Sequence, residues 1–291
     1  MVAGVRGEVR FNARLRDLTS FRIGGPADVL VIPADVEALA RLVRQTWKAR
    51  CPIFVMGGTN VLVRDGGIRG VVVSLAKLKA ITDEGRGVVY AEGGVGMPTL
   101  IQYAIRHSLA GLEWAAGIPG TVGGCLVMNA GTRLGEMKSA VKAVRLIDPR
   151  GGIRDCPASR LTFKYRRTKL PRGIVVGVWL QLTPSPRARV SRVVKDYLRY
   201  RKETQPLTLH NAGCVFRNPP DKPAGQLIEE VGMKGARVGD AQVSEKHANF
   251  VVNLGDASAA DVMTLIKKVM RAVERRTGEK LQLELKIVGQ P

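Results

Sequence analysis

Two glycine-rich segments carry the clearest chemical signal in this sequence. The longer, residues 111–131, reads GLEWAAGIPGTVGGCLVMNAG, and the shorter, residues 56–63, reads MGGTNVLV. Glycine has no Cβ, so its backbone adopts positive φ angles and lets a bulky ligand approach the peptide amides. Successive amides of this kind can bind a diphosphate. Two such segments, each beside an expected strand, indicate one large phosphate-bearing cofactor.

Either segment alone is typical of an ordinary turn between strands. Together, GGTNVLV and AGIPGTVGG resemble the FAD-binding loops of the UDP-N-acetylenolpyruvoylglucosamine reductase family, flavoenzymes that complete UDP-N-acetylmuramic acid for bacterial cell walls. Matching segments extend the resemblance over nearly the whole chain, which looks like the shorter subtype of the family. The resemblance implies FAD and NADPH as cofactors. It places FAD against ten residues: Gly57, Gly58, Thr59, Asn60, Gly117, Gly120, Thr121, Gly123, Gly124 and Asn129.

Two further segments resemble parts of the family that act on the substrate. Reduction of an enolpyruvyl double bond needs hydride at the methylene carbon, stabilisation of the carboxylate-conjugated carbanion, and a proton at the neighbouring carbon. FKYRRT, residues 163–168, implies that Tyr165 binds substrate and that Arg166 faces the developing negative charge, a role that suits a guanidinium. LELKIVG, residues 283–289, implies a catalytic role for Glu284. On pattern alone, Arg166 is a surface arginine and Glu284 an outward-facing strand carboxylate.

The segment NAGCVFRNPP, residues 211–220, contains the main departure from the family pattern. It resembles a glycine-serine-x-phenylalanine-lysine-asparagine-proline motif, with Cys214 where serine is usual and Arg217 where lysine is usual. A thiol is a stronger acid than a hydroxyl, so Cys214 can serve as the catalytic proton donor. As a lone cysteine it is more typical of core filling. The resemblance also implies that Arg217, Asn218 and Gln226 bind the substrate.

The elements that must position these residues follow from periodicity and turn signals. Apolar runs predict strands at 29–32, 52–56, 71–75, 88–91, 140–147, 174–182 and 281–288. Asp35 is expected to cap a helix with Val36, Leu39, Ala40, Val43 and Trp47 at three-and-four spacing, and Leu100, Ile101 and Ala104 indicate the next helix. A basic helix is expected at about 189–203, and Ser258 with Asp261 predicts a capping box for a helix that ends before Gly278.

This alternation of strands and helices predicts an α+β fold in two domains. The segment TPSPRAR, residues 183–189, contains two prolines and is the expected boundary. We expect an FAD-binding domain at 1–185, with lobes of about 1–75 and 76–185, and an α+β substrate-binding domain at 186–291. The resemblance implies a cofactor domain of the PCMH/vanillyl-alcohol-oxidase type. GxGxxG is absent, so NADPH has no Rossmann unit, and the resemblance implies that it alternates with the sugar nucleotide in one cleft with ping-pong kinetics.

Composition excludes some classes of protein and leaves others open. The chain has 291 residues and a formal net charge of +21, which attracts anions. The basic residues are spread widely and no zinc-finger or RNP-like motif is present, so we expect no specific nucleic-acid partner. Four scattered cysteines without a CxxC pair argue against a metal site and a disulfide framework. Without a long apolar run or an apolar signal core, we expect no membrane span and a cytoplasmic location.

Two alternatives remain open at the level of sequence. The chain is compatible with another FAD-dependent oxidoreductase on the same cofactor fold, such as an oxidase of small alcohols, which would make the matches at 211–220 and 283–289 accidental. A basic nucleic-acid-binding protein is favoured by the charge alone. A flavin spectrum of the purified protein separates the flavoprotein from the binding module. The sequence does not define the oligomeric state, and a monomer is compatible with it.

Overall fold

The computed structural model describes residue 2 and residues 4–291 and divides into two compact units. The first unit comprises Met1–Arg10, Leu30–Gly57 and Gly70–Tyr200. The second comprises Phe11–Val29, Gly58–Arg69 and Arg201–Pro291. The predicted division at residue 185 between an FAD-binding and a substrate-binding domain remains a proposal.

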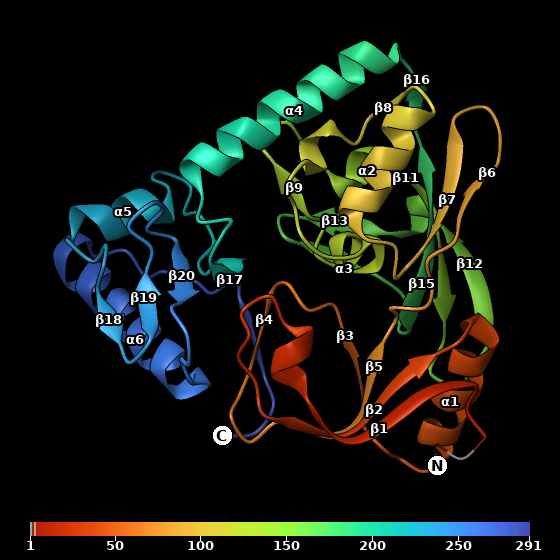
Figure 1. The fold of residues 1–291 in the computed structure, drawn as a ribbon, viewed down its shortest axis with the longest axis horizontal. Helices are drawn as coiled ribbons and strands as arrows, with labels where there is room; N and C mark the ends of the chain where they lie inside the picture. The colour runs from red at the N-terminus through yellow and green to blue at the C-terminus, as the bar shows by residue number, and fades with distance from the viewer. Residues whose placement is uncertain (1, 3) are drawn as a thin grey trace. The chain divides into compact units, whose positions relative to one another are not determined.

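The first unit contains a five-stranded antiparallel sheet with two helices packed in its core (Figure 1). The strands lie in the order β12 (Ile153–Pro157), β11 (Val141–Ile147), β15 (Ile174–Gln181), β7 (Val88–Glu92) and β6 (Ile81–Asp83). Helices α2 (Met97–Arg106) and α3 (Val122–Val127) bury apolar side chains in the same cluster as β11 and β15. The sheet therefore supports the glycine-rich segment that contains α3.

A four-stranded sheet has the order β1 (Gly7–Arg14), β2 (Pro26–Pro33), β5 (Ile68–Ser74) and β3 (Ile53–Met56). Three of these strands, β1, β2 and β5, each have residues in both units. Helix α1 (Val36–Lys48) begins as predicted, because the Asp35 side chain accepts a hydrogen bond of 2.8 Å from the amide of Ala38. Leu39 and Val43 are buried, whereas Trp47 in the last turn is 47% exposed. Strands β3 and β5 are parallel. Strand β3 ends at Met56, directly before Gly57 of the shorter glycine-rich segment.

The basic helix predicted at 189–203 is observed as α4 (Arg187–Thr204). Val190, Val194 and Tyr197 on one side of it pack into the core of the first unit. Before it, Thr183–Pro184 forms the short strand β16, which pairs with β8 (Leu109–Ala110). The first part of the TPSPRAR segment is therefore paired with the first unit rather than free.

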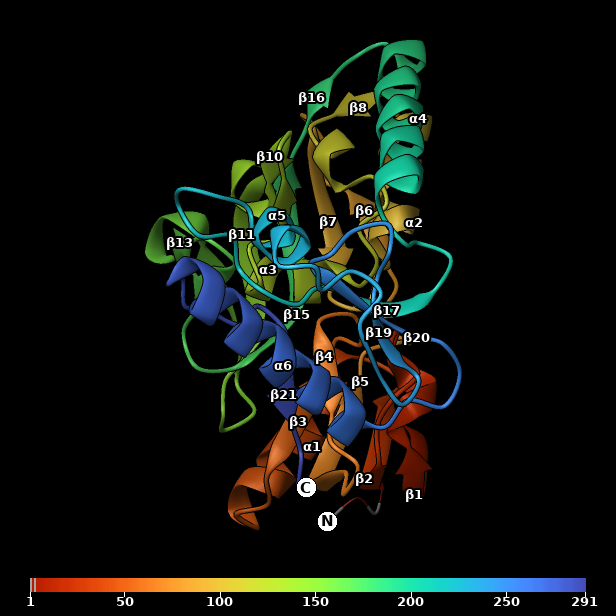
Figure 2. The same ribbon diagram turned by 90° about the vertical axis from the view of Figure 1, so that its left-hand side faces the viewer.

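The second unit contains a four-stranded antiparallel sheet and two helices (Figure 2). Its strands lie in the order β17 (His210–Cys214), β20 (Phe250–Asn253), β19 (Ala241–Val243) and β18 (Arg237–Val238). Helices α5 (Ala224–Glu230) and α6 (Ala259–Thr277) contribute buried side chains to the same core. The predicted capping box is confirmed, and Gly278 ends α6 in the left-handed conformation with φ 76°.

The closing strand predicted at 281–288 is shorter than expected, which corrects that prediction. Only Lys286–Val288 forms a strand, β21, which pairs in parallel with β4 (Val61–Val63). Residues 282–285 bond instead to the segment after β17, through a Leu283–Phe216 bridge and the backbone at Val215. Leu281 and Leu285 are buried, and the backbone changes partner between Leu285 and Lys286.

The remaining elements are short. They are the strands β9 (Gly131–Thr132), β10 (Gly135–Glu136), β13 (Thr162–Lys164) and β14 (Arg167–Lys169), and the 3-10 helices Leu15–Leu18, Glu113–Ala115, Met137–Ser139 and Ala158–Arg160.

Candidate active site

The two glycine-rich segments meet inside the first unit. Gly57 directly follows β3, and Gly124 lies in α3. A Cβ placed on Gly57 would lie 4.0 Å from the Cα of Gly124 and would meet no other heavy atom of the protein within that distance. Both glycines are half-buried. Backbone therefore faces backbone without an intervening side chain, which is the arrangement that a cofactor bound by peptide amides requires.

The longer segment, however, is not the continuous loop that its glycines indicated. Residues Val122–Val127 form α3, and the hydroxyl of Thr121 accepts a hydrogen bond of 3.3 Å from the amide of Gly124. Gly117 and Gly120 before the helix have φ angles of 74° and 106°. Gly123 packs against the turn after β7, where a Cβ would lie 3.0 Å from the carbonyl oxygen of Gly93. Gly123 is therefore required by packing, whatever it contributes to a ligand.

The shorter segment continues into the second unit with Gly58, Thr59 and Asn60. Gly58 has a φ of 79°, and a Cβ there would lie 2.6 Å from the carbonyl oxygen of Leu18. The amide group of Asn60 donates a hydrogen bond of 3.1 Å to the carbonyl oxygen of Glu284. Thr59 and Asn60 are half-buried. The structure thus joins a predicted cofactor segment to the predicted catalytic glutamate.

Tyr165 and Arg166 form the turn of a two-stranded hairpin in the first unit. Lys164 pairs with Arg167, so these two residues alone connect β13 to β14. Tyr165 is 49% exposed, and the guanidinium carbon of Arg166 lies 5.0 Å from the centre of its ring. Arg166 adopts a φ of 55°, in the left-handed region. The hairpin presents an aromatic ring and a cation side by side.

Cys214 and Glu284 lie on adjoining backbone segments of the second unit. Cys214 ends β17 opposite Phe250, after a bulge at Gly213 with φ 79°. The amide of Glu284 donates a hydrogen bond of 2.8 Å to the carbonyl oxygen of Val215, the residue that follows Cys214. Both Cys214 and Glu284 are half-buried. The second unit therefore places Cys214, Glu284 and Asn60 on backbone segments that are bonded to one another.

A second cysteine shows how strongly burial alters a thiol in this fold. Cys125 lies in α3, is buried, and has its pKa raised to about 12 by that burial. A thiol with so high a pKa remains protonated and unreactive at neutral pH. Cys214, at the end of a strand and half-buried, has the more accessible thiol.

Three of the four residues predicted to bind substrate lie in the second unit, in different settings. The Nε of Arg217 is buried without a hydrogen-bond partner among the described residues, as is that of Arg64. Asn218 accepts a hydrogen bond of 3.1 Å from the amide of Ala224 at the start of α5. Gln226 is exposed and donates one of 3.0 Å to the carboxylate of Glu230. A buried guanidinium N–H without an acceptor is costly, so Arg217 and Arg64 are the residues that most need a ligand.

A cavity of about 980 Å³ in the first unit was not indicated by the sequence. Its wall includes Ile53 and Val55 of β3, Ile147, Ile174 and Trp47. Strand β3 leads from this cavity directly to Gly57. Side chains alternate along a strand, so Ile53 and Val55 point to the same side of β3. The sequence shows this alternation, but it does not show which residues form the opposite wall of the cavity.

Two features are absent from the described residues, a metal-binding cluster and a membrane-spanning helix. Among residue 2 and residues 4–291, no group of three or more His, Cys, Asp or Glu side chains is arranged to hold a metal ion. Over the same part of the chain, no helix has the length and apolar character needed to cross a membrane.

Comparison with known proteins identifies relatives along nearly the entire chain. The model for the FAD binding domain matches residues 27–157, and the model for the UDP-N-acetylenolpyruvoylglucosamine reductase C-terminal domain matches residues 205–288. UDP-N-acetylenolpyruvoylglucosamine reductase of Syntrophus aciditrophicus is 44% identical, with 98% of this chain and 94% of the relative covered. UDP-N-acetylenolpyruvoylglucosamine reductase 2 of Symbiobacterium thermophilum is 46% identical, with coverage of 97% and 93%.

A solved structure agrees with these sequence matches. The crystal structure of UDP-N-acetylenolpyruvylglucosamine reductase from Thermus caldophilus superposes with a TM-score of 0.84 at 38% identity, covering 98% of this chain and 99% of that one. These matches confirm the predicted α+β fold and its FAD-binding domain. The chain belongs to the UDP-N-acetylenolpyruvoylglucosamine reductase family.

Proposed function

We propose that this protein reduces the enolpyruvyl group of UDP-N-acetylglucosamine enolpyruvate to give UDP-N-acetylmuramic acid, a precursor of peptidoglycan, with FAD as its cofactor and NADPH as reductant. The observation that carries the proposal is that family similarity covers both the FAD-binding part and the C-terminal part of the chain. Another flavin oxidoreductase on this fold would match only the first of these.

The residues of the first unit suit FAD. The bare backbone at Gly57 and Gly124 leaves room for a diphosphate, and the positive φ angles of Gly117 and Gly120 turn further peptide groups in the same segment. The apolar cavity beside β3 is our candidate for the adenosine end. When bound, FAD supplies the redox chemistry that transfers hydride from NADPH to the substrate.

The proposed catalytic roles follow from the chemistry of each side chain. Hydride addition at the methylene carbon places negative charge on the neighbouring carbon and on the carboxylate conjugated with it. Arg166 binds that carboxylate through its planar guanidinium, which stabilises the charge as it develops. Cys214 donates its thiol proton to the neighbouring carbon, which completes the saturated lactyl ether. Glu284 assists this proton transfer from the segment bonded to Val215.

The remaining roles concern recognition of the nucleotide sugar. Tyr165 contributes an exposed ring beside Arg166. Arg217 contributes a cation whose buried Nε has no acceptor among the residues that the structure describes. Asn218 and Gln226 complete the proposed set of substrate contacts. In the same proposal, NADPH and the nucleotide sugar occupy one site in turn. Cytoplasmic action also belongs to it, since four scattered cysteines without a CxxC pair suit a reducing compartment.

The test mixes purified, FAD-loaded protein with NADPH, with and without UDP-N-acetylglucosamine enolpyruvate. We expect NADPH oxidation that depends on the enolpyruvyl sugar and parallel double-reciprocal plots, the pattern of a ping-pong reaction. UDP-N-acetylglucosamine without the enolpyruvyl group is the matched control and should leave the rate at background. Flavin reduction by NADPH without transfer to the enolpyruvyl sugar would contradict the proposal and favour a different oxidoreductase.

A further inference from the structure

The catalytic arginine proposed above lies in a backbone conformation that arginine rarely adopts. Tyr165 and Arg166 are the two central residues of the turn between β13 and β14, and Arg166 has a φ of 55°. Turns with a positive φ at the second central position favour glycine there, because a side chain crowds the backbone. Such strained residues persist where the surrounding structure holds them, and they cluster at functional sites.

Within the described part of the chain, no third strand lies beside the hairpin that carries this turn. Strands β13 and β14 pair there only with each other. An isolated two-stranded hairpin is marginally stable at best in water, so its position must be fixed from outside. The turn needs an anchor on each side if the arginine is to have a defined place.

Two buried side chains provide these anchors, and both connect to α3 or to the segment that follows it. The hydroxyl of Thr168, which is 7% exposed, donates a hydrogen bond of 2.5 Å to the carbonyl oxygen of Leu126 in α3. The amide group of Asn129, 1% exposed, donates one of 3.2 Å to the carbonyl oxygen of Lys164. The side-chain oxygen of Asn129, Oδ1, accepts a hydrogen bond of 3.0 Å from the backbone amide of Lys138. The anchors lie on both sides of the turn, at the residue before Tyr165 and two residues after Arg166.

We propose that Thr168 and Asn129 are positioning residues that hold Arg166 in its left-handed turn and thereby set the guanidinium for the substrate carboxylate. This inference rests on the proposed role of Arg166. It gives Asn129 a different role from the cofactor contact that the family resemblance implied, because both polar groups of its side chain are engaged by backbone. Helix α3 also carries Gly124, so one helix positions Gly124 and, through Leu126, the hairpin of Arg166.

The first test compares Thr168→Val with Thr168→Ser. Valine keeps the shape of the side chain but removes the hydroxyl. The carbonyl oxygen of Leu126 still accepts a hydrogen bond of 3.0 Å from the amide of Asn129, so the fold should survive. We expect kcat for the enolpyruvyl sugar to fall on the order of 10- to 100-fold, the scale of a misplaced catalytic group. FAD content and the rate of flavin reduction by NADPH alone should not change. Serine restores the hydroxyl and should restore most of kcat.

The second test measures the strain itself and requires no turnover. Arg166→Gly removes the side chain from a left-handed residue, so the melting temperature should rise although turnover is lost. Arg167→Gly is the matched control on the adjacent strand residue, where glycine should lower the melting temperature. A melting temperature of Arg166→Gly no higher than that of Arg167→Gly would overturn the inference.

The two proposals fail in distinguishable ways. Normal turnover in Arg166→Gly would remove the proposed catalytic role of Arg166 and the positioning inference with it. Lost turnover in Arg166→Gly together with normal kcat in Thr168→Val would leave the catalytic role intact and overturn the positioning role alone. Loss of FAD in Thr168→Val would also overturn the positioning role, because Thr168 would then support the cofactor segment rather than Arg166 in particular.

Discussion

A Cβ on Gly57 would meet only the Cα of Gly124, at 4.0 Å, and this close approach of backbone to backbone offers a direct test of cofactor binding. Gly57→Ala adds one carbon at ordinary contact distance from Gly124. We expect the apoprotein to keep its melting temperature while the Kd for FAD rises by about tenfold or more, equivalent to about 1.4 kcal/mol or more. Flavin fluorescence titration measures the Kd.

Gly96→Ala is the control for this prediction. Gly96 has a φ of −67°, and its nearest neighbour to an added Cβ is the Thr99 hydroxyl at 3.6 Å. FAD binding should be normal in that variant. Equal FAD affinity in Gly57→Ala and the native protein would mean that the cofactor does not approach Gly57. Gly58 and Gly123 are poorer choices, since a Cβ at either position meets protein backbone at 2.6 and 3.0 Å.

Cys214 makes the proton-donor role testable by conservative exchange. Cys214→Ser retains a hydroxyl donor and should keep substantial activity, whereas Cys214→Ala should lower turnover of the enolpyruvyl sugar by roughly 10²–10⁴-fold, the range for a lost general acid. Flavin reduction by NADPH should survive in both variants, which stopped-flow absorbance can follow. Alkylation should inactivate the native protein unless substrate is present. Near-normal turnover in Cys214→Ala would move the donor role to Glu284 or water.

Family resemblance in the sequence selected these residues as candidates, but their contacts could not be predicted from it. Resemblance selected Arg166, yet nothing in FKYRRT shows that its φ is positive or that Thr168 bonds to a residue 42 positions away. Asn129 was predicted to bind cofactor, and its two backbone partners are visible only once the hairpin is folded against α3. Arg64 was missed altogether, because a buried, unpartnered Nε has no sequence signature.

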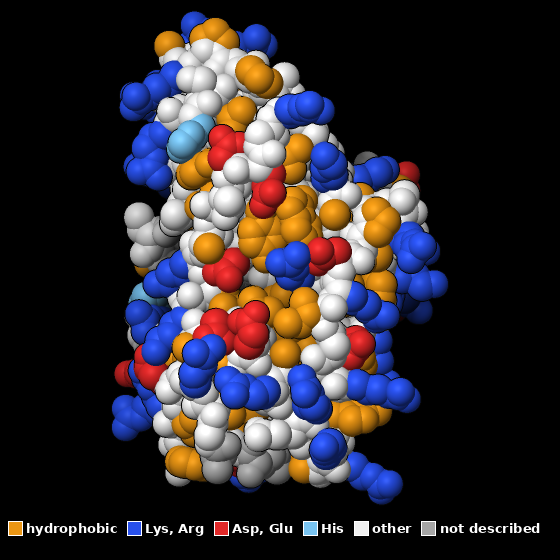
Figure 3. Space-filling view, turned by 90° about the vertical axis from the view of Figure 1, so that its right-hand side faces the viewer, with side chains coloured by type: hydrophobic (Ala, Val, Ile, Leu, Met, Phe, Trp, Pro, Cys, Tyr) orange, Lys and Arg blue, Asp and Glu red, His pale blue; other side chains and the backbone are white. Residues whose placement is uncertain are grey.

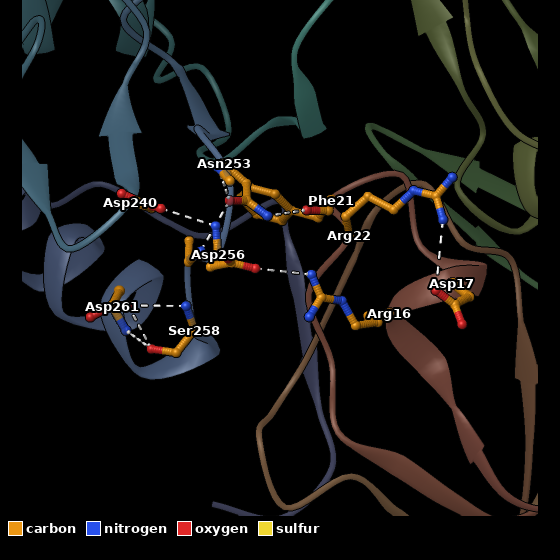
Figure 4. Close-up of polar contacts among 11 residues, drawn as sticks. Arg16, Asp17, Phe21, Arg22, Asp240, Asn253, Asp256, Ser258 and Asp261 are labelled. Atoms are coloured by element: carbon orange, nitrogen blue, oxygen red, sulfur yellow. Dashed lines mark hydrogen bonds and ion pairs between the residues drawn. The ribbon is translucent and has the colours of Figure 1, made fainter.

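At the level of elements, the N-terminal end of α6 combines two sets of caps in the second unit. Ser258 accepts a hydrogen bond of 3.0 Å from the amide of Asp261 and donates one of 2.7 Å to its carboxylate (Figure 4). The Asp65 carboxylate accepts from the amides of Ala259 and Ala260 at 2.9 and 3.0 Å. The first three amides of the helix are therefore satisfied by side chains.

Ser258→Ala should lower the free energy of unfolding by about 1 kcal/mol, the usual cost of a lost N-cap. Urea denaturation followed by circular dichroism measures this change. Thr264→Ala, at an exposed position within the same helix, is the control and should be neutral or slightly stabilising because alanine has the higher helix propensity. A loss in Thr264→Ala as large as in Ser258→Ala would show that the cap is not responsible.

The same cap predicts a pH dependence. Hydrogen bonds from the Ser258 amide, and then from its hydroxyl, lower the pKa of Asp261 below its usual value of 3.8. A carboxylate whose pKa is lowered in the folded state stabilises the fold. That stabilisation is fully present above pH 3.8, the usual pKa of the group, and is lost as the pH falls through the folded-state pKa. Asp261→Asn should therefore flatten the stability curve below about pH 4. An unchanged acid limb in that variant would contradict the assignment.

Elements with strong periodicity were predictable, and those fixed by tertiary partners were not. The helices α1, α2, α4 and α6 and the strands β2, β3, β5, β7, β11 and β15 follow from apolar spacing and caps. The edge strands β1, β6 and β12 and the four strands of the β17–β20 sheet were not predicted. Helix α3 was not indicated, because Gly123 and Gly124 lower its intrinsic helix propensity and packing against the turn after β7 compensates. The segment 281–288 alternates like one strand but changes partner from Val215 to β4 partway along.

The charge of the whole molecule exceeds what the proposed reaction requires. Of the 291 residues, 46 are Lys or Arg and 25 are Asp or Glu, which gives +21. On the face drawn in Figure 3, Lys and Arg are spread among acidic and hydrophobic side chains rather than gathered in one patch. Exposed basic residues also occur on helices of both units, such as Arg192 and Lys195 on α4 and Lys267 and Lys268 on α6. A field distributed in this way attracts polyanions without recognising a base sequence.

Any binding to DNA should therefore be weak, non-specific and removed by salt. Affinity that comes from phosphate contacts falls steeply as counterion concentration rises, so gel-shift binding seen at about 50 mM salt should be lost near 200 mM. Arg192→Glu with Lys195→Glu should weaken low-salt binding about as much as Lys267→Glu with Lys268→Glu, because neither helix forms a dedicated site. Tight binding to a defined DNA sequence that survives high salt would identify a specific nucleic-acid surface. Loss of low-salt DNA binding in only one of the two double variants would identify one as well.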